Sequence, residues 1–343
     1  MKLDLMVTPL PLRRAQDLAR DAAAAGFSGL VFTEAGRTAY LSCAAAALAA
    51  EIDLATGIAV AFPRSPMVTA QIAWELADAT GGRFRLGLGT QVRAHIERRY
   101  AAPFDPPGPR LREYVLAVKA AFRAFRGEEK LGFDGDFYQL SLLPGQWSPG
   151  PIAAADPPVD VAAVNPWMLR MAGEVADGVH VHPLNNPVYL DTTVLPSLTE
   201  GAARAGRDRT ELTVSVPVFT VVGDDEEERS FWRELARTQV AFYGSTPNYG
   251  FIFDQLGFEG LTGRIRERQK AGDLAGMAAA VDDQVLSHFT VECPWDELGD
   301  RLVDRCRGRA DRVILYFAAL AWMRDRSSLA RWGEALAGVT GQT

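Results

Sequence analysis

The segment GGRFRLGLGTQVRAHIERRY, residues 81–100, changes character halfway along its length. Its first half contains a short apolar run, from Phe84 to Leu88, that is typical of a buried strand. Glycines interrupt this run at Gly87 and Gly89. Glycine weakens a strand interior, so its presence there marks a bend or a close approach of another group to the backbone. We therefore expect the end of this strand to lie beside a flat or charged ligand.

The second half of the same segment is basic. It carries Arg93, Arg98 and Arg99, together with His95, one of four histidines in the chain. Arginines that follow a glycine-rich strand end would attract an anion through charge-assisted hydrogen bonds. The alternative is a solvated helix face on which the arginines have no ligand.

Short apolar runs of the same kind recur along the chain and alternate with helical patterns. A chain that alternates strands and helices builds a parallel sheet, and strands that are apolar throughout are buried on both faces. Eight such units predict a (β/α)8 barrel, the TIM barrel fold. The eight predicted strands are KLDLMVTP (2–9), GLVFTEA (29–35), IDLATGIAVAF (52–62), RFRLGLGT (83–90), VDVAAVN (159–165), GVHVHPL (178–184), LTVSVPVFTVVG (212–223) and DRVILYFAAL (311–320).

Two segments do not fit the minimal repeat. Residues 127–157 suggest a small hairpin and a proline-rich loop, and residues 224–294 suggest a long helical excursion. Since the alternation of strands and helices resumes after each, we expect one barrel domain over residues 1–343 with two insertions. Aromatic residues of the second insertion are candidates for a lid that excludes water: Phe242, Tyr249, Phe251 and Phe253.

Composition excludes some classes of protein. The net charge of -7 does not favour a nucleic-acid-binding protein, which needs a basic face. No apolar stretch of 18 residues predicts a membrane span, so we expect a cytoplasmic protein that acts on a small-molecule substrate. The three cysteines, Cys43, Cys293 and Cys306, have no metal-binding spacing and are expected to be buried.

Polar residues follow several predicted strands, at the barrel end where active sites of this fold lie. Glu34 follows the second strand and is either a proton donor or a salt-bridged rim residue. Asn165 is placed to cap a helix whose first N–H groups could bind a phosphate. His180 and His182 lie two residues apart on one face, but no carboxylate stands at ligand spacing, so no metal is expected.

Taken together, these segments resemble the luciferase-like monooxygenase superfamily, and within it the branch that uses the deazaflavin coenzyme F420. The stretches that carry the resemblance are AGFSGLVFTE, ATGIAVAFPRSP, GGRFRLGLGTQVRAHIERRY, PGPRLREYVLAVKAAFRAFRG and MAGEVADGVHVHP. The resemblance implies a barrel with insertions that forms a homodimer. It also implies a flavin or deazaflavin ring over a bulge in the third strand, with a non-prolyl cis peptide at Gly57-Ile58.

The resemblance further implies an F420-dependent oxidoreductase that transfers a hydride between C5 of the deazaflavin and an organic substrate. An FMN-dependent monooxygenase of the same superfamily is the alternative, and a catalytically inactive cofactor-binding barrel is a third. The histidine that many F420 enzymes carry after the strand-two acid is replaced by Ala35, so the candidates for proton supply are Glu34, His95 and His182. The candidates for cofactor binding are Thr33, Gly57, Ile58, Gly89, Thr90, Val164, Asn165, Trp167, Met168, Arg98 and Arg99.

Overall fold

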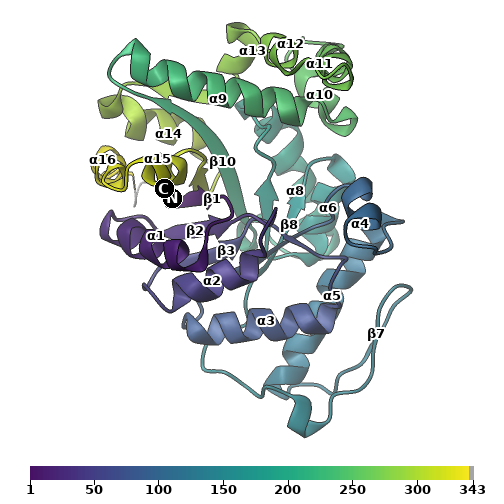
Figure 1. The fold of residues 1–343 in the computed structure, drawn as a ribbon. Helices are drawn as coiled ribbons and strands as arrows, with labels where there is room; N and C mark the ends of the chain where they lie inside the picture. Colours follow the sequence, from purple (N-terminus) through teal and green to yellow (C-terminus); the bar gives the residue numbers. More distant parts are fainter. Residues whose placement is uncertain (340–343) are drawn as a thin grey trace.

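The computed structural model describes residues 1–339, and eight parallel strands in that range close into a barrel (Figure 1). The strand order runs β12-β1-β2-β3-β5-β8-β9-β10, and β10 pairs with β12 to close the circle. The prediction of a (β/α)8 barrel is confirmed. The barrel strands are β1 (Lys2–Val7), β2 (Gly29–Phe32), β3 (Asp53–Thr56), β5 (Phe84–Gly89), β8 (Val159–Ala163), β9 (Gly178–Val181), β10 (Thr213–Val222) and β12 (Arg312–Leu315).

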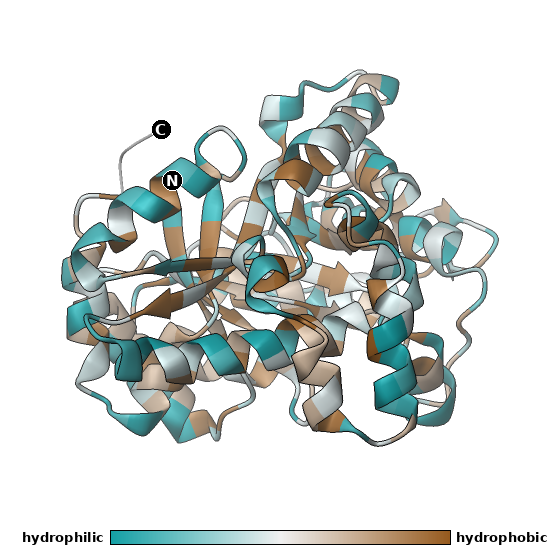
Figure 2. Ribbon diagram, turned by 90° about the horizontal axis from the view of Figure 1, so that it is seen from above, coloured by the Kyte–Doolittle hydropathy of each residue, from teal (hydrophilic) through white to brown (hydrophobic). Residues whose placement is uncertain are grey.

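Helices surround the barrel and present apolar faces to the strands, which appear as brown elements at the centre of Figure 2. Helix α1 buries Ala15, Leu18, Ala19 and Ala22 at helical spacing. The helices that follow the barrel strands are α1 (Leu12–Ala24), α2 (Ala39–Ala47), α3 (Pro66–Ala79), α4 (Arg93–Arg98), α5 (Pro107–Arg126), α6 (Pro166–Val175), α7 (Pro187–Tyr189), α8 (Leu195–Arg204), α14 (Leu298–Cys306), α15 (Ala318–Arg324) and α16 (Ser328–Ala335).

Residues 127–157 contain a two-stranded antiparallel hairpin, β6 (Phe133–Asp134) with β7 (Gln139–Leu140). The carboxylate of Glu113 on α5 anchors its turn, since it accepts hydrogen bonds from the backbone N–H groups of Asp136 (3.0 Å) and Phe137 (2.8 Å). The hairpin stands away from the barrel at the lower right of Figure 1.

Residues 224–294 form a helical layer above the barrel, where α9 crosses the top of Figure 1. A short strand, β11 (Thr290–Cys293), pairs in parallel with the outer part of β10, from Phe219 to Val222. The sequence pattern did not predict this strand. The elements of the layer are α9 (Glu226–Gly244), α10 (Gly250–Asp254), α11 (Leu261–Lys270), α12 (Leu274–Ala279) and α13 (Asp283–Ser287).

The barrel interior is polar at the N-terminal ends of the strands. Arg312 on β12 donates two hydrogen bonds to the buried carboxylate of Asp4 on β1, at 2.6 and 2.7 Å. Arg85 on β5 pairs in the same bidentate way with Asp160 on β8, at 2.9 and 2.6 Å. These two ion pairs lie inside the barrel and are largely buried.

A glycine beside each aspartate makes room for its pair. Gly29 on β2 stands next to Asp4, and a Cβ there would lie 2.5 Å from Asp4 Oδ1. Gly178 on β9 stands next to Asp160, and a Cβ there would lie 2.4 Å from Asp160 Oδ1. The order arginine, aspartate, glycine therefore occurs on β12-β1-β2 and again, four strands later, on β5-β8-β9.

Above this polar layer the interior becomes apolar. Met6, Val31, Ala55 and Ile314 form a small cluster separate from the main core, and Tyr316 packs against it. The three cysteines are buried and free, as the sequence predicted. Within residues 1–339, no helix combines the length and the apolar composition needed to cross a membrane.

Candidate active site at the C-terminal end of the barrel

A bulge follows β3 at the C-terminal end of the barrel, before β4 (Ala59–Val60). The peptide bond between Gly57 and Ile58 within it is cis, which confirms the bond that the family resemblance implied. A Cβ at Gly57 would lie 2.2 Å from Val31 Cγ1, so only glycine fits there. Ile58 in turn lies over Gly89 on β5, where a Cβ would lie 2.8 Å from its Cδ1 atom. The bulge is therefore packed directly onto β2 and β5.

Gly87 has a different role from the one predicted. A Cβ at this position would lie 2.0 Å from the carbonyl oxygen of Thr56 and 2.9 Å from His180 Nε2. The Thr56 hydroxyl also bridges to Gly87, donating to its carbonyl oxygen at 2.7 Å and accepting from its N–H at 2.9 Å. Protein atoms fill the space beside Gly87, so the expectation that it admits a ligand is wrong.

Glu34, directly beyond β2, lies in a nearly buried ion pair. Its carboxylate accepts hydrogen bonds from both terminal nitrogens of Arg64, one of them at 3.0 Å, and from the backbone N–H of Val60 at 2.7 Å. Burial lowers the pKa of Arg64, but the hydrogen bond and the charge of Glu34 outweigh it and raise that pKa overall. Both carboxylate oxygens are thus occupied by donors that hold the residues beyond β2 and the bulge together.

His182, just beyond β9, lies among aromatic rings. Its Nδ1 accepts a hydrogen bond from the backbone N–H of Leu184 at 3.1 Å. Its ring centre lies 4.7 Å from that of Tyr243 on α9 and 4.5 Å from that of Tyr249. Burial lowers the pKa of His182 to about 3, so the imidazole is neutral at ordinary pH. With Nδ1 as acceptor, the ring proton of the neutral imidazole is on Nε2.

Two tyrosine hydroxyls meet at the same end of the barrel. Tyr316 follows β12 directly, Tyr243 comes from the helical layer, and their oxygens are 2.5 Å apart. Burial raises the pKa of both phenols. Neither residue was among the predicted site residues. Tyr316 lies inside the predicted strand 311–320 and is the first residue beyond β12, and Tyr243 is the neighbour of Phe242, one of the predicted lid aromatics.

His180 lies deeper than His182, inside the barrel. Its Nε2 is 3.6 Å from Asp160 Oδ2, and burial lowers the pKa of the imidazole although the carboxylate opposes this effect. His180 therefore belongs to the polar layer of ion pairs, while His182 belongs to the barrel mouth. The two histidines share a face, as the sequence predicted, but lie in different environments.

Helix α4 carries the basic half of the opening segment, and its arginines divide into two kinds. Arg93 is neutralised by Asp105 and by Glu97, the latter at 3.0 Å. Arg98 and Arg99 are exposed, and neither forms an ion pair with any residue in the range 1–339.

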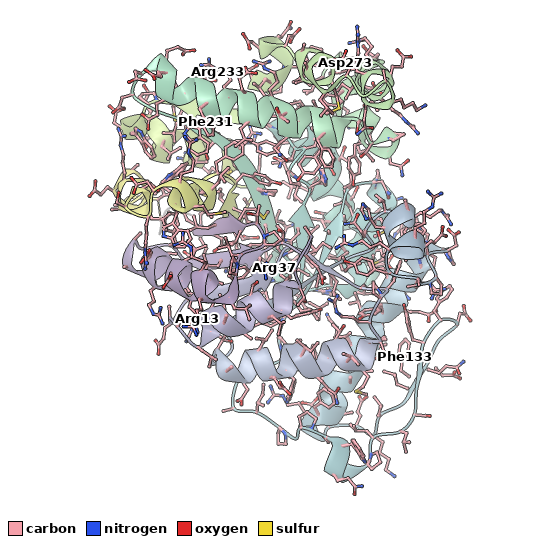
Figure 3. All side chains as sticks on the ribbon, in the orientation of Figure 1. Arg13, Arg37, Phe133, Phe231, Arg233 and Asp273 are labelled. Carbon is pink, nitrogen blue, oxygen red and sulfur yellow. The ribbon has the colours of Figure 1, made fainter. Side chains whose placement is uncertain are left out.

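One of the two unpaired arginines, Arg99, lies close to the loop after β2. Arg99 donates a hydrogen bond to the carbonyl oxygen of Ala35, which joins α4 to this loop. Arg37 lies on the same loop and is labelled near the centre of Figure 3. His95 on α4 is also exposed, and no hydrogen bond of its ring within residues 1–339 connects it to Glu34 or His182. The structure therefore separates these three candidates for proton supply.

The predicted phosphate-binding loop follows β8. The Asn165 side chain caps α6 by accepting from the N–H of Met168 at 3.0 Å. The Tyr189 hydroxyl donates to the carbonyl oxygen of Val164 at 2.6 Å, which fixes the strand end. The Trp167 ring is 45% exposed and covers Gly108 at the start of α5. This loop presents an open helix start and a large aromatic surface.

Thr33 and Thr90, the remaining candidates, are half-buried beyond their strands. The Thr33 hydroxyl donates to the carbonyl oxygen of Val7 at 3.2 Å, and the Thr90 hydroxyl donates to that of Gln91 at 3.0 Å. The structure thus groups Thr33, Glu34 and the Gly57-Ile58 bulge on one side of the barrel mouth.

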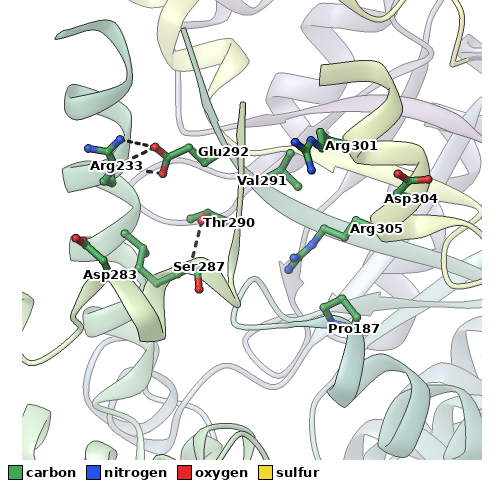
Figure 4. A pocket seen from close by; sticks show the side chains of 11 residues that line it. Pro187, Arg233, Asp283, Ser287, Thr290, Val291, Glu292, Arg301, Asp304 and Arg305 are labelled. Carbon is green, nitrogen blue, oxygen red and sulfur yellow. Dashed lines mark hydrogen bonds and ion pairs between the residues drawn. The ribbon is translucent and has the colours of Figure 1, made fainter. Parts of the chain in front are cut away.

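A pocket of about 750 Å³ lies elsewhere, between α9, α13, β11 and α14 on the outside of the barrel (Figure 4). None of the predicted site residues lines it. Arg233 is neutralised there by Glu226 and Glu292, and Arg301 pairs with Glu297 at 2.8 Å. The predicted site residues therefore gather at the barrel mouth, which is the candidate active site, and not in this pocket.

Comparison with known proteins gives the family of this chain and proteins of similar sequence and fold. Residues 3–312 match the family described as luciferase-like monooxygenase. An uncharacterized protein of Mycobacterium tuberculosis is 39% identical over 320 residues, which cover 93% of this chain and 94% of the relative. The 5,10-methylenetetrahydromethanopterin reductase of Archaeoglobus fulgidus is 26% identical over 274 residues, covering 77% of this chain and 76% of the relative.

Solved structures show the same fold. The coenzyme F420-dependent tetrahydromethanopterin reductase of Methanopyrus kandleri superposes with a TM-score of 0.79 at 21% identity, and 98% of each chain is covered. The oxygenating constituent of 3,6-diketocamphane monooxygenase of Pseudomonas putida, in complex with FMN, superposes with a TM-score of 0.65 at 16% identity, covering 100% of this chain and 97% of that one. Similar folds therefore serve both F420 and FMN.

Proposed function

Because the chain belongs to the luciferase-like monooxygenase family, we propose that it is an F420-dependent oxidoreductase acting on a small organic substrate. The family includes F420-dependent reductases and flavin-dependent monooxygenases. A sequence relative over three quarters of the chain is a reductase of a tetrahydromethanopterin derivative, which supports the reductase branch. When bound, the deazaflavin would supply hydride transfer at its C5 atom, and the protein would supply binding, orientation and electrostatics.

The barrel mouth offers a surface suited to a flat ring. The Gly57-Ile58 bulge lies beside Val31, and the apolar cluster of Met6, Ala55 and Ile314 is close below. Residues of this mouth are only half-buried, whereas the strands beneath them are closed by packing. An apolar, partly exposed platform at the carboxyl ends of barrel strands is where this fold binds ligands. The residues present therefore fit a flavin or deazaflavin ring.

The observation that favours F420 over FMN is the pair of unneutralised arginines, Arg98 and Arg99, on α4. F420 carries an oligoglutamate tail that is more anionic than the single phosphate of FMN. Arginines without a carboxylate partner are available for bidentate contacts to such a tail. Arg93 on the same helix is already paired and has no such capacity.

The chain's own residues divide the work of binding. The Glu34-Arg64 pair would hold the bulge under the ring, because its hydrogen bonds tie Val60 and the loop after β2 together. The capped start of α6 and the Trp167 surface would receive the phosphate side of the cofactor. An FMN-dependent monooxygenase is the second candidate, and the Pseudomonas putida structure with FMN is its support.

Binding of F420 and of FMN to the purified protein, measured side by side by fluorescence, tests the proposal. We expect at least about ten-fold tighter binding of F420, on the scale of one or two charge-assisted hydrogen bonds. Equal affinities, or tighter binding of FMN, would favour the monooxygenase instead.

A further inference from the structure

The hydroxyl pair of Tyr243 and Tyr316 at the barrel mouth has one hydrogen that the protein does not use in a hydrogen bond. The hydroxyls of Tyr243 and Tyr316 carry two protons, and one of them lies in the hydrogen bond between the two oxygens. Within residues 1–339, neither oxygen donates to any other protein acceptor. Since both side chains are half-buried and not sealed in the core, the second phenolic hydrogen remains available to a ligand.

His182 supplies another free hydrogen beside this pair. Its Nδ1 is engaged by Leu184, so the neutral ring carries its proton on Nε2. The structure shows no protein acceptor for this N–H among residues 1–339. The imidazole packs edge-on against Tyr243 with ring centres 4.7 Å apart. A phenol and an imidazole, each with a donor hydrogen that the protein does not use, thus pack against each other at the mouth.

We infer that these two hydrogens bind a single oxygen atom of the substrate, and that the substrate carries a neutral carbonyl or hydroxyl group there. Two donors fixed by their surroundings form a ready-made site for one acceptor oxygen. This inference rests on the proposed function, because it takes the barrel mouth as the place where substrate binds. It goes beyond that function by giving the chemical class of the group that is recognised.

The charges at the site argue for a neutral oxygen rather than a carboxylate. The walls around the donors are aromatic, with Phe219 at 4.6 Å from Tyr316 and Tyr249 at 4.5 Å from His182, measured between ring centres. A buried carboxylate needs a cation or several donors to offset its desolvation. Arg64, the guanidinium that follows the bulge, is already engaged by Glu34. A ketone, aldehyde or alcohol matches the two neutral donors.

Neither Glu34 nor Ala35 supplies such a donor, because Glu34 is held by Arg64 and Ala35 has an apolar side chain. Tyr316 follows β12, two strands from β2 around the barrel, and His182 follows β9, on the opposite side from β2. The substrate oxygen would therefore be held by residues that follow β12 and β9.

Cyclohexanone and methylenecyclohexane test the inference, because they have the same shape and differ only in the acceptor oxygen. Their dissociation constants, measured by ligand-observed NMR on the purified protein without cofactor, give a ratio of hydrocarbon to ketone. We expect this ratio to fall about five-fold in the double variant Tyr243→Phe/Tyr316→Phe and by a similar factor in His182→Phe, the scale of one neutral hydrogen bond. His182→Gln keeps an N–H donor, so this variant should lower the ratio of dissociation constants less than His182→Phe does.

The matched control is Tyr138→Phe, which removes a phenol oxygen beside the hairpin, where the ring packs on Tyr114 of α5 with ring centres 5.4 Å apart. The bound carbonyl carbon of 13C-labelled cyclohexanone should also resonate downfield of the free ketone in the parent protein and return toward the free value in the double variant. A parent protein that does not bind the ketone, or a ratio unchanged in both donor variants, would overturn the inference.

F420 binding is measured on the same proteins. If the parent protein does not bind F420 but the ratio of dissociation constants changes as expected, the proposed function is refuted and the inference about the two donors is not.

Discussion

The two ends of the barrel interior treat polar groups in opposite ways. At the N-terminal ends of the strands, every charge of the Arg312-Asp4 and Arg85-Asp160 pairs faces an opposite charge at hydrogen-bond distance. At the C-terminal ends, the Tyr243-Tyr316 pair and His182 each keep one donor hydrogen that no residue in the range 1–339 accepts. The charges of these two ion pairs are neutralised within the protein, whereas these neutral donors are left for a ligand.

The difference has a physical cause. A buried charge without a partner is so unfavourable that it must be paired within the chain. A neutral donor at a half-buried surface costs much less, because water can satisfy it until a ligand replaces the water. The N-terminal end of the barrel interior, with its two ion pairs, is here called the closed end, and the C-terminal end, with the Tyr243-Tyr316 pair and His182, the open end. The closed end can therefore stabilise the barrel, while the open end can keep donors available for a ligand.

Removing one partner of a buried ion pair at the closed end should have the largest effect on stability. Asp160→Leu would leave Arg85 inside the barrel without its partner, and we expect the free energy of unfolding to fall by about 3 to 5 kcal/mol. Chemical denaturation monitored by circular dichroism measures this loss. The double variant Arg85→Met/Asp160→Leu should regain most of it, since no uncompensated charge remains.

An exposed ion pair provides the control. Glu200→Gln removes a partner of Arg204 from a pair whose side chains are 48% and 54% exposed, and should cost less than about 1 kcal/mol. If Asp160→Leu lowered the free energy of unfolding as little as this control, the buried ion pairs would contribute no more to stability than exposed ones.

At the open end, the contribution of His182 to the stability of the protein should depend on pH. The folded-state pKa of His182 is lowered to about 3, below the value of about 6.5 in an unfolded chain, so the unfolded state binds the extra proton first as the pH falls. The contribution of His182 to stability is therefore complete above pH 6.5 and declines between pH 6.5 and 3. Between pH 7 and pH 5 we expect the parent protein to lose about 2 kcal/mol more than His182→Gln.

Denaturation at the two pH values measures this difference. His95→Gln, which changes an exposed imidazole on α4, should lose stability in parallel with the parent protein. A His182→Gln variant with the same pH dependence as the parent would show that packing among the aromatic rings does not lower the pKa of His182.

The arginines of α4 should show the smallest effect, and it should depend on salt. Arg98→Gln/Arg99→Gln should weaken F420 binding by about 1 to 2 kcal/mol at low ionic strength and by less at high ionic strength, because exposed charges are screened. Arg93→Gln removes one positive charge from the same helix, but that charge is already neutralised, and binding should change little. Equal losses in both variants, or no loss in the double variant, would make this helix face a solvated surface only.

The strands of the barrel could be predicted from the sequence. Apolar runs such as GLVF and VDVAA predicted all eight barrel strands, because a strand buried on both faces needs apolar residues on both. β11 was not predicted because it lies inside an insertion, where no alternation of strands and helices surrounds it. The cis bond at Gly57-Ile58 came from the family resemblance, since no local pattern distinguishes this peptide from its neighbours.

The candidate site was readable only in part. Glu34 and His182 were identified by their positions after strands, but their environments depend on residues far away in the chain: Arg64 comes from the segment after the bulge, and Tyr243 comes from a helix 61 residues beyond His182. Gly87 was assigned to a ligand because a glycine does not reveal what fills the space beside it.

By itself, the sequence determined the number and order of the barrel strands and the end of the barrel at which polar residues gather, because hydrophobic periodicity and strand ends are local properties of the chain. Only the tertiary structure decided which polar groups satisfy one another. Asp4 meets Arg312 across 308 positions, Glu34 meets Arg64, and Tyr316 meets Tyr243 across 73. The physical reason is that a hydrogen bond is set by distances of about 3 Å, which barrel closure creates between residues that have no relation in the linear order.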